Sequence, residues 1–224
     1  MKKLLILTLL LCFTFTLNAQ SRYLEVGKSG IGIGLCVQES YWEDGFTGTI
    51  GYSFNGIFDV NIWGGIYTYD HLKVNGDDID QKETALGGMV TWWLLRTKTG
   101  QDRGVDIGLF GGYEYEEYKI DDEKSATSDG LETGAIFAIN FDVNEKCYLQ
   151  PFYSLGYSYS KMKKESSDDI DTHKGATSRY GVSLIRKLCN GSRIVVTFET
   201  DTDAIQKTND AAYEFCISYM IGFL

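Results

Sequence analysis

The chain has 224 residues and a formal net charge of −10, with a single proline, 25 glycines and 14% aromatic residues. A chain this acidic is a poor candidate for nucleic-acid binding, so no nucleic-acid partner is expected. The scarcity of proline fits a chain in which most residues donate to a β ladder. After the first twenty residues no stretch is apolar enough for a transmembrane helix. A spanning strand, however, needs only about 9–11 residues of alternating character.

The first nineteen residues have the pattern of a cleaved secretory signal. Lys2 and Lys3 precede an apolar run from Leu4 to Leu17, and Ala19 offers a small residue before a cut ahead of Gln20. The signal carries two lysines and no acid, so the remaining chain has a net charge of −12. We expect residues 20–224 to form one all-β domain.

Hydrophobic residues alternate with small or polar residues almost throughout that domain, which predicts β-strands. In the first strand, for example, Ile31 and Ile33 share one face and Gly32 and Gly34 the other. The third strand is less regular, because Trp63 and Tyr67 fall on its polar face. Ten strands are expected, or eight if the third and the eighth are misread. In chain order they cover residues 30–37, 46–54, 58–67, 84–95, 105–116, 131–142, 149–159, 179–184, 193–199 and 213–223.

The connections alternate between short turns and long polar loops. Asn55-Gly56 is the strongest short hairpin signal, and further short turns are expected at 96–103, 143–146 and 189–192. The longer connections lie near Tyr41 and at 70–82, 119–129, 161–176 and 201–210. This asymmetry is typical of an antiparallel up-and-down transmembrane β-barrel with short periplasmic turns and longer outer loops. An even strand count places both termini in the periplasm.

Composition indicates which face of the strands points outward. The aromatic and aliphatic residues of ten strands would overfill the lumen of a small barrel, so we expect them to face lipid. A tyrosine girdle is expected near the outer loops. Its candidates are Tyr67, Tyr69, Tyr113, Tyr115, Tyr157 and Tyr159. The alternative is a soluble secreted barrel that turns the apolar face inward and binds an apolar ligand.

The signal, the alternating strands, the loop asymmetry and the aromatic last strand together resemble the small outer-membrane β-barrel proteins, the porin-like barrels of OmpA and OmpW type. The resemblance covers residues 22–224 and implies an outer-membrane location. It also implies outer-membrane lipid and lipopolysaccharide as partners, and the barrel-assembly machinery during biogenesis. Many such barrels end on an aromatic residue, whereas Phe223 is penultimate here and Leu224 is last.

A second resemblance concerns the omptin-type outer-membrane proteases, whose site resembles an Asp-x-Asp facing an Asp-x-His. The corresponding candidates here are Asp78 and Asp80 in one outer loop and Asp171 and His173 in another. In such a set one aspartate orients a histidine base and the other pair positions water. These loops are acidic throughout, so the pattern also arises by chance. The preferred hypothesis is therefore a non-enzymatic barrel without cofactor or resident metal.

The acidic residues give two further expectations. Loop carboxylates could bind divalent cations through their oxygens, although a solvated loop face is the preferred explanation. These carboxylates are Asp77-Asp78, Asp121-Asp122-Glu123, Asp168-Asp169 and Asp201-Thr202-Asp203. Inward-facing charges are expected to converge at the outer mouth of the lumen and to favour cations if the barrel conducts. They are Glu114, Glu116, Glu132, Glu199, Glu214 and Arg179. Lys161, Lys163 and Lys164 could meet lipopolysaccharide phosphates.

Two cysteine pairs are candidates for disulfides, because directly opposed strand residues lie within bonding range and exported proteins meet an oxidising compartment. The alternative is that all four cysteines are free buried thiols. If Gly30 lies opposite Gly222 where the first and last strands meet, Cys36 lies opposite Cys216. If the hairpin of the seventh and eighth strands is centred near Asp168, Cys147 lies opposite Cys189. The barrel is accordingly expected to serve as a structural or surface-interaction protein, or as a very narrow passage for small solutes.

Overall fold

The computed structural model is a closed barrel of ten antiparallel strands in which each long strand pairs with its neighbours in the chain. The structure describes residues 27–39, 43–69, 73–74, 77–78, 81–96, 103–120, 123–165, 170–189, 191–203 and 212–223. No helix in these segments is long and apolar enough to cross a membrane. The predicted fold class and the count of ten strands, rather than eight, are confirmed.

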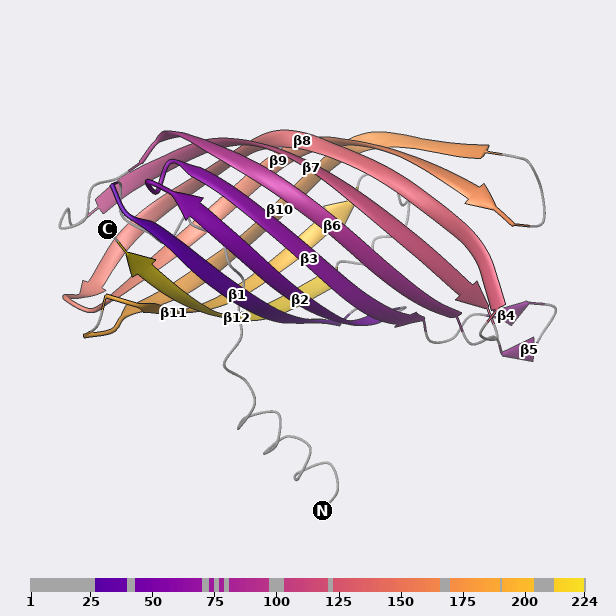
Figure 1. The fold of residues 1–224 in the computed structure, drawn as a ribbon, viewed down its shortest axis with the longest axis horizontal. Helices are drawn as coiled ribbons and strands as arrows, with labels where there is room; N and C mark the ends of the chain where they lie inside the picture. The colour runs from indigo at the N-terminus through magenta and orange to yellow at the C-terminus, as the bar shows by residue number, and fades with distance from the viewer. Residues whose placement is uncertain are drawn as a thin grey trace, which may run out of the picture.

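The described residues form twelve strands, ten in the barrel wall and two in a small separate hairpin (Figure 1). The wall consists of β1 (Ser29–Glu39), β2 (Glu43–Phe54), β3 (Phe58–Tyr69), β6 (Gln81–Leu95), β7 (Arg103–Ile120), β8 (Glu123–Asn144), β9 (Cys147–Lys164), β10 (Ile170–Lys187), β11 (Arg193–Asp203) and β12 (Ala212–Phe223). The small hairpin pairs β4 (Lys73–Val74) with β5 (Asp77–Asp78). β1 pairs with β12 and closes the barrel.

Two of the expected outer loops are wrong, because the strands continue through most of them. β7 and β8 pair as far as Ile120 and Glu123, and β9 and β10 as far as Lys163 and Ile170. The polar residues of 119–129 and 161–176 therefore lie largely on extended hairpins (Figure 1). Alternation is hard to read there, since both faces of a strand that meets water are polar. Residues 201–203 likewise belong to β11 rather than to a loop.

The short connections define one end of the barrel, here called the turn end, and the opposite end is called the loop end. At the turn between β2 and β3, Asn55 and Gly56 have φ values of 54° and 60°. Two successive positive φ angles form the turn whose twist matches a β-hairpin. Gly191, in the turn between β10 and β11, has a φ of 82°. β1 begins at Ser29 and β12 ends at Phe223, and these two paired residues also lie at the turn end.

The barrel is apolar outside and polar inside. Ile66 and Leu86, on the outer face, are 60% and 58% exposed, whereas Asp59, Asp106 and Gln150 on the inner face are 1%, 2% and 0% exposed. A soluble barrel has the opposite arrangement, because burying apolar surface stabilises it in water. The alternative of a soluble barrel with an apolar ligand cavity is therefore wrong.

The turn between β2 and β3 gives a test of the hairpin geometry. Replacing Gly56 with alanine places a Cβ at a left-handed position and should lower the free energy of unfolding by about 1 kcal/mol. Unfolding in urea, followed by the gel mobility of unheated samples, measures the change. The control is Gly111→Ala, where the nearest atom to the new Cβ is 3.9 Å away. Equal stability of both variants would contradict the assigned turn.

Candidate functional site

At the turn end, polar side chains from β7, β8 and β9 cross-link the lumen. The Asp106 carboxylate accepts hydrogen bonds from the Asn140 amide at 3.0 Å and from the Gln150 amide at 3.2 Å. Gln150 also donates to the Asn140 carbonyl oxygen at 2.7 Å. Three strands are thus joined by a triangle of hydrogen bonds whose members lie on the inward faces. Polar groups shielded from water are stable only when they are paired in this way.

Two arginines complete the closure of this end. Arg96 donates from Nη1 to the carbonyl oxygen of Gly56 at 2.7 Å, and its guanidinium stacks over the Trp93 ring at 4.9 Å. Arg193 donates from Nη1 to the Tyr148 hydroxyl at 2.7 Å. Tyr148 in turn packs with an apolar cluster, which comprises Ile185, Val195 and Met220. Arginines, acids, aromatic rings and aliphatic side chains together fill the cross-section.

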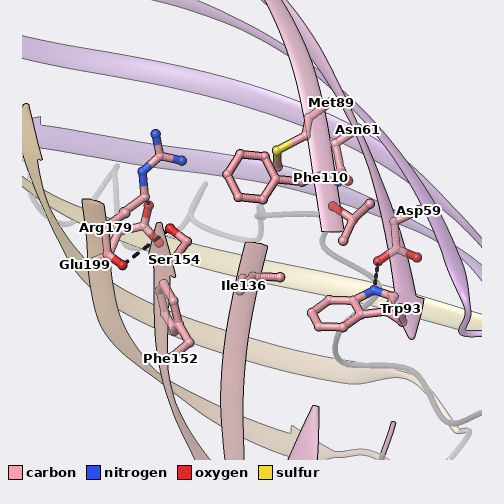
Figure 2. A pocket seen from close by; sticks show the side chains of 11 residues that line it. Asp59, Asn61, Met89, Trp93, Phe110, Ile136, Phe152, Ser154, Arg179 and Glu199 are labelled. Carbon is pink, nitrogen blue, oxygen red and sulfur yellow. Dashed lines mark hydrogen bonds and ion pairs between the residues drawn. The ribbon is translucent and has the colours of Figure 1, made fainter. Parts of the chain in front are cut away.

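On the loop-end side of this network lies a small cavity of about 30 Å³. Figure 2 shows its two polar margins, where the Trp93 indole donates to Asp59 at 2.7 Å and Arg179 faces Glu199 at 4.0 Å. Between them lies a wall of apolar side chains, here called the collar, which consists of Met89, Phe110, Ile136 and Phe152. A cavity this small has room for about two water molecules. The lumen is therefore constricted at the collar and closed at the turn end.

The loop half of the lumen forms an acidic vestibule. Its six inward-facing carboxylates belong to Glu83, Glu114, Glu116, Glu132, Glu199 and Glu214. Arg179 faces Glu132 at 3.9 Å as well as Glu199, so the structure brings these three predicted residues together. Glu132 also accepts a hydrogen bond from Thr177 at 2.7 Å, and Glu116 accepts one from Tyr118 at 2.7 Å. One guanidinium cannot neutralise this many carboxylates, so the vestibule has a negative potential.

Two inward-facing aromatic residues narrow the vestibule and hold one of its acids. Trp63 donates from Nε1 to the Glu114 carboxylate at 3.0 Å and lies against Gly87, where its ring leaves no space for a Cβ. Tyr67 packs in the same way on Gly45, and its hydroxyl shares a hydrogen bond of 2.9 Å with Thr47. The glycines on neighbouring strands thus provide the space that these rings occupy.

The tyrosine girdle is only partly correct. Tyr113 and Tyr157 are exposed on the outer face, as expected. Tyr67 and Tyr69 instead point into the lumen, where the Tyr69 hydroxyl donates to Glu83. The odd-numbered residues of β3, which include Asp59, face inward. The two tyrosines have odd numbers and so follow the strand's alternation.

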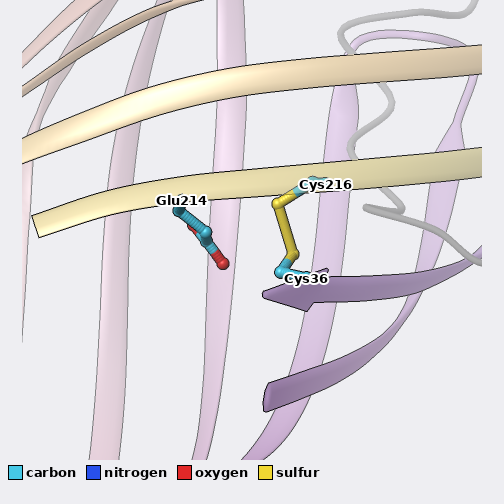
Figure 3. A group of neighbouring side chains, drawn as sticks. All are labelled: Cys36, Glu214 and Cys216. Carbon is cyan, nitrogen blue, oxygen red and sulfur yellow. A yellow bond between two sulfur atoms is a disulfide. The ribbon is translucent and has the colours of Figure 1, made fainter. Parts of the chain in front are cut away.

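The first cysteine pair lies where the register expectation placed it. Gly30 faces Gly222, and Cys36 faces Cys216 with a Cα–Cα distance of 4.2 Å. The two sulfurs are joined in a disulfide (Figure 3). The Glu214 carboxylate lies within 4.8 Å of these sulfurs, so the three residues have the spacing of a metal-ligand set. A disulfide has no thiolate to offer, however, and the oxidised pair is not a metal site.

The prediction of a second disulfide, between Cys147 and Cys189, is wrong. Cys147 faces Arg186 across the β9–β10 hairpin, a register three residues away from the expected one, and Cys147 and Cys189 are free. β10 ends at Lys187, so Cys189 lies beyond the paired strand and is exposed. The error arose from centring the hairpin on Asp168.

The candidate protease residues are not brought together in the part of the chain that the structure describes. Asp171 and His173 are exposed on β10, where Asp171 forms an ion pair with Lys164 at 3.0 Å. The backbone of Asp78 lies in β5, and Asp80 lies outside the described residues. The acidic loop residues Asp121, Asp122, Asp168 and Asp169 also lie outside them. The β4–β5 hairpin lies in the connection between β3 and β6, and β7, β8 and β9 separate β6 from β10 around the barrel.

Sequence reasoning missed the residues that close the lumen. Arg96 falls in an expected turn, and the expected strands contain Asp59, Asp106, Gln150 and Arg193 without giving any of them a role. The signal that could have found them is a long polar side chain at an inward position beside a short turn. Such a side chain is shielded from solvent and needs a partner within the protein. Glu83 was also missed, although it shares the inward alternation of Ala85 and Gly87.

No protein-family model matches the chain, and no curated protein matches its sequence. Among solved structures, the translocator domain of the autotransporter NalP from Neisseria meningitidis gives a TM-score of 0.51 at 10% identity, covering 88% of each chain. The attachment invasion locus protein Ail of Yersinia pestis gives 0.43 at 12% identity, covering 88% of this chain and 99% of that one. The outer-membrane protease OmpT from Escherichia coli gives 0.40 at 9% identity, covering 87% and 94%. The chain has the fold of the outer-membrane β-barrels.

The hydrogen-bonded triangle at the turn end should matter for stability. Asp106→Ala leaves two buried amides without their shared acceptor, and we expect it to lower the free energy of unfolding by about 2–4 kcal/mol. Urea unfolding monitored by gel mobility measures the loss. The matched control is Asp129→Ala, which removes an acid that hydrogen-bonds Tyr113 at an exposed position and should change stability by less than about 0.5 kcal/mol. A similar small effect at Asp106 would contradict the network.

Proposed function

We propose that this chain is a non-enzymatic outer-membrane β-barrel that keeps its own lumen closed and acts through its outer surface. The observation that carries the proposal is the occluded turn end. An aqueous pore leaves its lining side chains accessible to water, whereas Asp106, Gln150, Ile185 and Val195 are buried. Closure favours a structural or surface-interaction role over the passage of solutes.

The dimensions of the wall support an outer-membrane location. β1 and β11 have 11 residues each, and β2, β3 and β12 have 12 each. These lengths match the roughly 9–11 residues that a tilted strand needs to cross a bilayer. The outer face that these strands present is apolar, as lipid requires. By analogy with such barrels, the turn end, where β1 begins and β12 ends, faces the periplasm and the vestibule opens outward.

One side of the wall projects beyond the rest, which supports a surface role. β7, β9 and β10 have 18 residues each and β8 has 22. Figure 1 shows the β7–β8 and β9–β10 hairpins extending well past the end of β11. The last β10–β11 pair joins Thr177 to Asp203, so residues 170–176 have no described strand on that side. A strand edge of this kind presents free N–H and C=O groups to which an extended segment of a partner can add.

The partners expected from the outer membrane also fit the outer face. Above the apolar belt, the ammonium groups of Lys161 and Lys174 lie 5.8 Å and 5.3 Å from the centre of the Tyr159 ring. Cations beside an aromatic ring suit the interface between acyl chains and charged headgroups. This arrangement supports lipopolysaccharide as the surrounding lipid. Divalent cations at the acidic loops remain a proposal of the same kind.

Closure of the lumen is testable in planar lipid bilayers. The purified barrel should give no stepwise conductance, because the turn end is filled. The combined variant Tyr148→Ala, Gln150→Gly and Phe152→Ala removes inward side chains from one strand and should open a pathway. The acidic vestibule should make that pathway selective for K⁺ over Cl⁻.

The control for the conductance experiment truncates outward residues of the same strand. Leu149→Ala, Tyr153→Ala and Leu155→Ala should fold into a barrel that stays silent. Folding of each variant is verified by the mobility of unheated samples. Conductance of the unaltered protein would contradict closure, and anion selectivity of the opened variant would contradict the acidic vestibule.

The free edge of β10 is testable by hydrogen–deuterium exchange. Amides of residues 170–176 that point away from β9 should exchange at least about tenfold faster than strand amides bonded on both sides. The matched control is Thr127–Gly134 in β8, which pairs with β7 and with β9. Equal protection of the two segments would mean that the edge is covered and would remove it as a docking surface.

A further inference from the structure

The disulfide lies at the one seam that closes the barrel. Cys36 is on β1 and Cys216 is on β12, and 180 positions separate them in the chain. These strands pair over their whole length, from Ser29 opposite Phe223 to Glu39 opposite Tyr213. The bond therefore joins the first strand to the last.

Neither sulfur is accessible once the barrel is closed. Cys36 is 2% exposed and Cys216 is 0% exposed. Both point into the lumen (Figure 3), and the residues opposite them on β2 and β11 are Thr47 and Thr197, which are buried as well. Thiol–disulfide exchange requires direct contact between the attacking sulfur and the sulfur attacked. A cysteine carried by another protein cannot make that contact through a lumen this narrow.

We propose that the Cys36–Cys216 bond is made before the barrel closes, by a protein disulfide that oxidises the exported, unfolded chain. This inference rests on the proposed outer-membrane destination, which takes the chain through an oxidising compartment. Closure then shields the bond, so that the folded barrel neither gains nor loses it through protein oxidoreductases. The free Cys147 and Cys189 lie at the turn end, outside the seam.

The reaction is a pair of exchanges. The Cys36 thiolate attacks the oxidant's disulfide, forms a mixed disulfide and releases one oxidant thiolate. The Cys216 thiolate then attacks the Cys36 sulfur, forms the Cys36–Cys216 bond and releases the second oxidant thiolate. Two electrons pass to the oxidant, and the two protons of the cysteines pass through solvent to its two thiolates, so that the oxidant becomes a dithiol.

The test compares oxidation of the reduced chain in two states, unfolded in urea and folded in detergent micelles. The Cys12→Ser, Cys147→Ser, Cys189→Ser background leaves only the seam pair, and a chelator keeps the Cys36, Cys216 and Glu214 donor set free of metal. A purified protein disulfide oxidant, at a urea concentration where it stays folded, is added to each state. Alkylation at timed intervals and mass spectrometry then measure the linked peptides.

We expect complete oxidation of the unfolded chain and a rate on the order of 100-fold lower for the folded reduced barrel, since attack there requires local opening. A reduced chain that fails to fold at all also supports the order of events, because closure then requires the bond. Oxidation of the folded barrel as fast as the unfolded chain would overturn the proposal. Adding Cys36→Ser to the background leaves one cysteine and should abolish the linked peptide. These measurements use the purified chain, so their outcome does not depend on whether the barrel conducts ions or binds a surface partner.

Discussion

Each strand of the barrel turns polar side chains inward, and those side chains must satisfy one another in a lumen that solvent reaches only from one end. At the turn end part of this requirement is met within the protein, because Asp106 is shared by the amides of Asn140 and Gln150, although Gln150 Oε1 has no hydrogen-bond partner. Arg193 similarly donates a hydrogen bond to the Tyr148 hydroxyl. Buried polar groups are costly when unpaired, so this network fixes the side chains that block the lumen. The closure to solutes that we propose rests on the same interactions that stabilise the polar interior.

The acidic residues of the interior lie on the other side of the collar for a related reason. One guanidinium beside these six carboxylates cannot neutralise their charge, so the charged forms are most stable where water can hydrate them. The loop end supplies that water, and there the walls also lose their apolar exterior. The projecting β7–β10 hairpins continue this polar region beyond the rim. A closed barrel with a charged, uneven outer rim is suited to contacts at a surface.

Much of the fold could be predicted because a strand that separates lipid from a polar lumen alternates strictly. The ten strands, the outward face and the pairing of Cys36 with Cys216 all follow from that alternation and from aligning Gly30 with Gly222. Prediction failed where water lies on both faces, as in the extended hairpins. The predicted partner of Cys147 was also wrong, because the register of the β9–β10 hairpin depends on the residue at which its loop is centred. An error in that centre shifts the pairing by a few residues. Arg96 could not be assigned from alternation, since its role depends on a contact with Gly56 in the neighbouring turn. Alternation does place Tyr67 on the inward face of β3, but not its hydrogen bond with Thr47 on the adjacent strand.

The most direct measurement of the central claim, that the apolar face is outside and the barrel spans a membrane, is fractionation of cells that express the full chain. Boiled and unboiled samples of each fraction are compared on a gel. The account predicts recovery with the outer membrane and a change in mobility on heating, because a closed barrel resists detergent until it is boiled. Recovery in the soluble fraction, without any change on heating, would contradict it.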